Sequence, residues 1–131
     1  MIVVDTNILG YMFLTSERSA QVERVYQLDP DWAVPLLWRS ELRNVLAMYL
    51  RKKIISFEDA NLIMDEAARL VYGREYDVPS YQVLKLVTVC NCSAYDCEFV
   101  ALAVDLGVQL VTVDKKVIGE FPNIALTPDH F

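Results

Sequence analysis

The segment IVVDTN at residues 2–7 decides the fold, because it places a short β-branched run directly before an acid. Such a run lacks the alternation of a half-exposed strand and is typical of a strand buried on both faces of a parallel sheet. The segment QLVTVD at 109–114 repeats the pattern near the other end of the chain. Ligands of open parallel sheets bind beyond the carboxyl ends of the strands, so Asp5 and Asp114 are predicted to lie at one such edge.

Short apolar runs alternate with amphipathic helical patterns between these two segments. Strands are predicted at 2–4, 32–34, 75–77, 108–113 and 124–126, and helices at 7–14, from Ser16 or Ser19 to 28, and at 36–52, 57–72, 93–106 and 115–120. Residues 81–89 fit either a helix or a strand, and the preceding Pro79 and Ser80 favour a helix. The alternation indicates an α/β fold in which helices cover both faces of a parallel sheet.

Length and composition limit the class of protein. A chain of 131 residues without an internal linker predicts a single domain spanning residues 1–131. No apolar run reaches the roughly 20 residues of a membrane helix, and the N-terminus lacks the features of a signal peptide, so we expect a soluble, cytoplasmic protein. The net charge of −6 argues against a protein that coats nucleic acid by broad electrostatic attraction.

The three cysteines and the basic residues each allow two interpretations. Cys90, Cys92 and Cys97 form an odd, closely spaced set that suits reduced thiols, whereas a zinc site would lack a nearby histidine because the single one is His130. The basic residues gather on or after the helix at 36–52 and directly after Asp114. They form either a solvated helix face or a set of phosphate contacts.

Four acids stand out because each lies where an apolar element begins, ends or faces the core: Asp5, Glu41, Asp96 and Asp114. Glu41 has apolar neighbours one turn away on both sides, so its carboxylate projects from the apolar face of its helix. Asp96 lies in the first turn of a helix, where the helix dipole alone could explain it. Converging carboxylates repel one another, and a hard, oxygen-seeking cation such as Mg²⁺ or Mn²⁺ would offset that repulsion.

The motifs around these acids resemble those of PIN-domain ribonucleases, most closely the VapC-type toxins of bacterial and archaeal toxin–antitoxin systems. The residues that carry the resemblance are VVDTN at 3–7, SEL at 40–42, SAYDCEFVALA at 93–103 and LVTVD at 110–114. They occur in the order of the family and span nearly the whole chain. The resemblance implies a three-layer α/β/α sandwich with a central, mostly parallel sheet. It also implies metal-dependent endonucleolytic cleavage of RNA, a cognate antitoxin and a homodimer.

The resemblance assigns roles to individual residues. Asp5, Glu41, Asp96 and Asp114 match the four catalytic acids, and Asn7 and Thr112 match polar positions that help to shape the site. Asp5 and Asp96 are expected to bind the metal directly, Asp114 directly or through water, and Glu41 through water or as a proton acceptor. The hydroxyl of Thr112 is expected to hold the Asp114 carboxylate in place, since the two residues share a strand face. Candidate RNA contacts are Arg43, Lys115 and Lys116.

Other functions stay open at this stage. A PIN-fold module that binds RNA or protein without cutting is one, although the complete acidic set speaks against it. A phosphatase with an aspartate nucleophile is another, but enzymes of that kind carry a second Asp two residues later, where this chain has Asn7. Glu98, beside the catalytic motif, is expected to face solvent or a partner.

Overall fold

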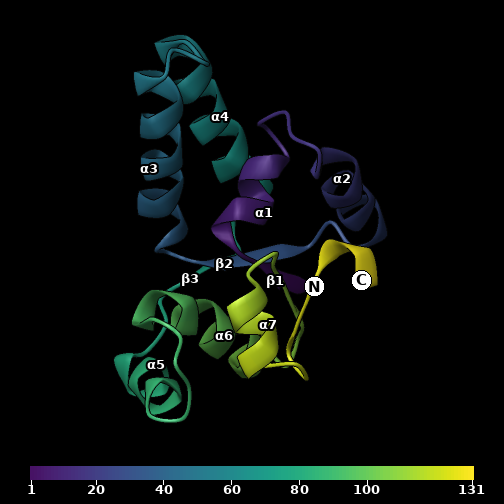
Figure 1. Ribbon diagram of the computed structural model, residues 1–131, viewed down its shortest axis with the longest axis vertical. Coiled ribbons are helices and arrows are strands. Elements are labelled where there is room, and N and C mark those ends of the chain that lie inside the picture. The colour runs from purple at the N-terminus through teal and green to yellow at the C-terminus, as the bar shows by residue number, and fades with distance from the viewer.

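In the computed structural model, which describes residues 1–131, a five-stranded sheet runs through the middle of the molecule in the order β3-β2-β1-β4-β5 (Figure 1). The strands are β1 (Ile2–Val4), β2 (Trp32–Pro35), β3 (Glu75–Tyr76), β4 (Leu110–Val111) and β5 (Ala125–Leu126). All neighbouring strands are parallel, so the sheet is wholly and not just mostly parallel. All five predicted strands are present, but the run at 108–113 forms a strand over only two residues.

Helices cover both faces of the sheet and make the expected three layers (Figure 1). Side chains of α1 to α4 pack with Ile2 and Val4 on one face, and side chains of α5 to α7 pack with Val3 on the other. Successive residues of a strand point to opposite faces, which is why the whole of β1 is apolar. The helices are α1 (Thr6–Tyr11), α2 (Ser19–Leu28), α3 (Trp38–Arg51), α4 (Phe57–Leu70), α5 (Ser80–Val87), α6 (Ala94–Leu106) and α7 (Lys115–Glu120), followed by the 3₁₀ turn η1 (Pro128–His130).

Local signals in the sequence explain several helix ends. Ser56 and Asp59 form a capping box at the start of α4, with hydrogen bonds of 3.0 and 3.3 Å between the side chain of one and the backbone N–H of the other. Ser93 caps α6, which ends at Gly107 in the left-handed conformation with φ of 66°. The ambiguous stretch after Pro79 is helical. None of the helices has the length and apolar character needed to cross a membrane.

The start of α3 is anchored to β3 by a charged hydrogen-bond network. Glu75 accepts hydrogen bonds from Trp38 Nε1 at 2.6 Å and from Arg39 Nε and Nη2 at 2.8 and 3.0 Å. The Arg39 hydrogen bond is the main reason that the pKa of Glu75 is lowered. The network fixes the first turn of the helix that carries Glu41, and it commits Arg39 to a structural ion pair.

Candidate active site

A cleft of about 380 Å³ lies at the carboxyl ends of β1 and β4. The strand order reverses between these two strands, because β2 and β3 lie on one side of β1 while β4 and β5 lie on the other. Crevices at such a switch point are the usual ligand sites of open parallel sheets. The lining includes all four acids and both supporting residues predicted from the sequence: Asp5, Glu41, Asp96, Asp114, Asn7 and Thr112.

Asp5 connects the sheet to the first helix. Its Oδ1 accepts a hydrogen bond of 2.9 Å from the backbone N–H of Ile8 and so caps α1, while its Oδ2 accepts a hydrogen bond from the Thr112 hydroxyl. Burial raises the pKa of Asp5 to about 6, and the negative charges of Glu41 and Asp114 act in the same direction, against the two hydrogen bonds. The protein therefore holds this carboxylate at an electrostatic cost.

Thr112 holds the carboxylate of Asp5 and not that of Asp114, which the sequence suggested. Its hydroxyl donates to Asp5, and it also accepts a 3.0 Å hydrogen bond from the backbone N–H of Asp114. The expectation that it holds the Asp114 carboxylate is wrong, because β4 lies directly beside β1. The backbone N–H of Asp5 donates to the Val111 carbonyl at 3.2 Å, which puts Asp5 next to Thr112.

Glu41 is half-buried in the cleft wall and is oriented by a residue that sequence reasoning missed. The Thr6 hydroxyl donates a 2.8 Å hydrogen bond to Glu41 Oε1, while Oε2 has no protein partner. Burial is the main cause that raises the pKa of Glu41, and the nearby Asp96 adds to it. In the sequence, the feature that could have identified Thr6 is its position between Asp5 and Asn7, where it is the first residue of α1.

Asp96 and Asp114 play different parts at helix starts. Asp114 caps α7, since its Oδ1 accepts from the backbone N–H groups of Lys116 at 2.9 Å and Val117 at 3.3 Å. At the start of α6 the capping side chain is that of Ser93, which accepts from the Asp96 backbone N–H at 3.0 Å. The carboxylate of Asp96 makes no hydrogen bond within the protein, and it lies in the first turn of α6, where the helix dipole favours a negative charge.

The chemistry of the lining suits a divalent cation, although the side chains do not converge on one point. The two ion pairs of the protein, Met1–Asp29 and Arg39–Glu75, leave all four cleft acids without a basic partner. An all-oxygen, carboxylate-rich set is what Mg²⁺ and Mn²⁺ prefer. No three acidic, histidine or cysteine side chains are close enough together to hold an ion in their present positions. Protein hydrogen bonds hold one or both oxygens of Asp5, Glu41 and Asp114.

Further polar residues in the lining had not been singled out from the sequence. Ser40 and Asn44 lie on α3 beside and one turn after Glu41, and Tyr95 precedes Asp96 and is 61% exposed. In the sequence, the feature that could have identified them is that they are polar residues close to Glu41 or Asp96 in the same helix. Glu98 is partly buried, and burial together with the charges of Glu41 and Asp77 raises its pKa.

The basic residues and the thiols lie outside the cleft lining. Lys115 and Lys116 are exposed in the first turn of α7, directly after Asp114, whereas Arg43 is exposed on α3. All three cysteines are free thiols, with the Cys90 and Cys97 sulfurs 3.5 Å apart. Burial raises the pKa of Cys97 to about 12, which keeps this thiol protonated at neutral pH.

Comparison with known proteins agrees with the fold and with the motifs. The family model for the PIN domain matches residues 2–124. Ribonuclease VapC3 of Pyrobaculum aerophilum is 28% identical in an alignment of 132 positions that spans 97% of this chain and 98% of the relative. Two solved structures of similar fold are 16% identical: FitAcB from Neisseria gonorrhoeae, with a TM-score of 0.78 over all of both chains, and a toxin–antitoxin complex from Klebsiella pneumoniae, with a TM-score of 0.71 over 98% of both chains.

Proposed function

The chain belongs to the PIN domain family, and from that premise we propose that it is a divalent-metal-dependent endoribonuclease, the toxin of a toxin–antitoxin pair in the cytoplasm. The observation that carries the proposal is the cleft at the sheet edge, where four carboxylates without basic partners come from α3, α6 and the segments that follow β1 and β4. The curated relative named as a ribonuclease, which aligns over almost the whole chain, supports the same reaction.

Each acid has a proposed role. Asp5 and Asp96 would bind Mg²⁺ or Mn²⁺ directly, Asp114 directly or through water, and Glu41 through water. Such a cation lowers the pKa of water and offsets the negative charge that develops on a phosphodiester during hydrolysis. Both carboxylate oxygens of Asp96 are free to bind a cation, because neither is engaged in a protein hydrogen bond.

The protein's own groups would position the reactants and move the proton. Glu41 keeps Oε2 free while Thr6 holds Oε1, so Glu41 can accept the proton of an attacking water. Its raised pKa suits that role. Thr112 holds Asp5 against rotation, and the exposed side chains of Asn7, Ser40 and Asn44 can donate to phosphate oxygens. Lys115 and Lys116, at the start of α7, are proposed contacts to the RNA backbone.

The proposal predicts that purified protein cleaves single-stranded RNA with added magnesium or manganese and stops when EDTA removes the cation. Cleavage should return when metal is added in excess over the chelator. A gel assay with a 5′-labelled RNA measures this, and internal cuts separate an endonuclease from an exonuclease. Tight RNA binding without any metal-dependent cleavage would instead favour the alternative, a PIN-fold module that binds RNA or protein without cutting.

We further propose a cognate antitoxin as a protein partner. One of the solved structures with this fold is a toxin–antitoxin complex. A metal-dependent nuclease would harm the cell that makes it, so a protein that covers or distorts the acidic cleft would be required. An acidic cleft favours basic side chains in the segment that enters it, because these would neutralise the four carboxylates.

A homodimer is the other proposed assembly, and the outer face of α5 and α6 is its candidate interface. These adjacent helices expose Tyr81, Leu84 and Val104, which are 75, 59 and 54% exposed, and Val89, just after the end of α5, is 72% exposed. Large apolar side chains gathered on one face mark interaction sites in soluble proteins. Leu84→Glu is expected to convert the dimer to monomer in sedimentation velocity, whereas Leu62→Glu on α4 should leave it intact. A wild-type protein that sediments as a monomer at micromolar concentration would contradict the assignment.

A further inference from the structure

The side of α3 that faces the cleft continues well beyond it. Ser40, Glu41 and Asn44 line the cleft near the start of the helix. With 3.6 residues per turn, Met48 follows Asn44 on the same side, and Arg51 and Lys52 follow Met48. The opposite side carries the buried Leu42 and Leu46. One exposed helix face therefore leads from the acids to the end of the α3–α4 hairpin.

The charge of this helix is opposite to that of the chain. Residues 39–53 contain five Lys or Arg and a single acid, Glu41, in a protein with a net charge of −6. Arg39 is paired with Glu75, but Arg51, Lys52 and Lys53 are exposed and have neither an ion pair nor a side-chain hydrogen bond. The helix end thus offers unpaired positive charge close to a negative cleft.

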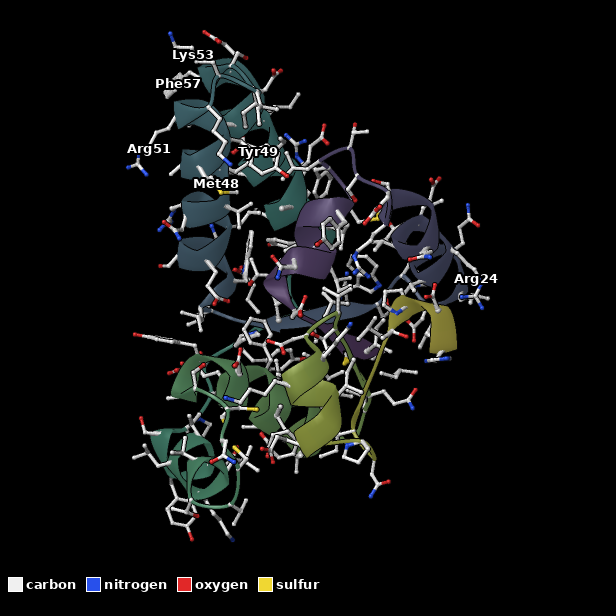
Figure 2. All side chains as sticks on the ribbon, viewed as in Figure 1. Arg24, Met48, Tyr49, Arg51, Lys53 and Phe57 are labelled. Atoms are coloured by element: carbon white, nitrogen blue, oxygen red, sulfur yellow. The ribbon has the colours of Figure 1, made fainter.

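Exposed apolar side chains accompany these cations. Met48 is 46% exposed on the cleft-facing side, and Phe57, the first residue of α4, is 67% exposed. Figure 2 shows Arg51 projecting outward from α3 and Lys53 and Phe57 together at the end of the hairpin farthest from the sheet. Cations that contact phosphates and an accessible ring on which a base can stack are the elements of a single-strand binding surface.

We propose that the face of α3 formed by Asn44, Met48, Arg51 and Lys52 binds the RNA strand next to the phosphate that is cut. The proposal rests on the proposed nuclease function. Asn44 and Arg51 are seven residues apart, or about 10 Å along the helix, which is about three stacked nucleotides at roughly 3.4 Å each. Arg51 and Lys52 then contact backbone phosphates about three nucleotides from the cut. The positive charge of Arg51 and Lys52 favours RNA over the proposed antitoxin, because a segment basic enough to enter the acidic cleft would be repelled by these cations, whereas RNA phosphates would be attracted to them.

The test compares two arginines that each lie in the last turn of a helix. Arg51→Glu reverses a charge on the proposed face, and Arg69→Glu reverses the same charge in the last turn of α4, outside the cleft lining. Each variant loses the same favourable interaction between an arginine and a helix C-terminus, so Arg69→Glu controls for any effect of Arg51→Glu on stability. Arg51→Glu is expected to raise KM for RNA roughly tenfold with kcat unchanged, and to lower the salt dependence of binding by about 0.7 in log–log slope. Arg69→Glu should change neither.

Shortened substrates sharpen the result. RNA that lacks the third and all later nucleotides on the side of the cut that follows α3 should bind wild type and Arg51→Glu equally, because the phosphate that Arg51 contacts is then missing for both proteins. Equal KM values and salt slopes for Arg51→Glu and Arg69→Glu would overturn the proposal while leaving the nuclease function intact. If the wild type does not cut RNA, fluorescence anisotropy can still measure the binding of single-stranded RNA to both proteins. Binding by Arg51→Glu that equals that of the wild type would then overturn the proposal. Arg51→Gln serves as a second, milder variant.

Discussion

Asp5→Asn should abolish RNA cleavage, with kcat/KM falling roughly a thousandfold or more, because it removes a proposed metal ligand and several kcal/mol of transition-state stabilisation with it. The change is close to isosteric. The Asn side chain can still accept from the Ile8 backbone N–H, and its amide nitrogen can donate to the Thr112 hydroxyl, so both contacts of Asp5 are retained. The loss would therefore report chemistry and not unfolding.

Initial rates with saturating magnesium and manganese measure this effect, and growth of cells that express each variant gives a second readout. Asp65→Asn is the matched control, because Asp65 is exposed on α4, away from the cleft lining. The control should keep the wild-type rate and the wild-type effect on growth. Equal cleavage by wild type and Asp5→Asn would remove Asp5, and with it the assigned cleft, from the catalytic mechanism.

Asp5→Asn should also stabilise the metal-free protein at neutral pH, by up to about 3 kcal/mol, which is the stability equivalent of two pKa units. The pKa of Asp5 is raised from 3.8 to about 6 in the folded protein. Between these values the unfolded chain has released a proton that the folded state still holds, so the Asp5 contribution to folding becomes less favourable as the pH rises from about 4 to 6. Above that window it stays constant. Replacement by a neutral amide removes the penalty.

Urea unfolding of wild type and Asp5→Asn at several pH values isolates this contribution, because Glu41 and Glu98 titrate in both proteins. The difference in unfolding free energy should be largest above pH 6 and should disappear near pH 4. Magnesium or manganese should raise the Tm of the wild type by several degrees and that of the variant much less, since a ligand that binds the folded state stabilises it. A difference that is the same at pH 4 and pH 7 would contradict the buried-charge explanation.

Local patterns were enough to predict most of the elements. The β-branched run before Asp5, the capping box at Ser56 and the left-handed Gly107 each act within a few residues, so they can be read from the sequence. The stretch 81–89 could not be read in this way, because its apolar spacing suits both a helix and a buried strand. In the structure most of this stretch forms α5, which packs against α6.

The sequence by itself determined the order of the elements, the identity of the four acids and their positions at the ends or on the inner faces of those elements. Only the tertiary structure decided which groups hold these acids. Thr112 donates to Asp5, 107 residues away, because β4 is the neighbour of β1 in the sheet, and Thr6 rather than a residue of α3 holds Glu41. Strand order and helix packing set such distances, and both come from contacts between segments that local periodicity does not encode.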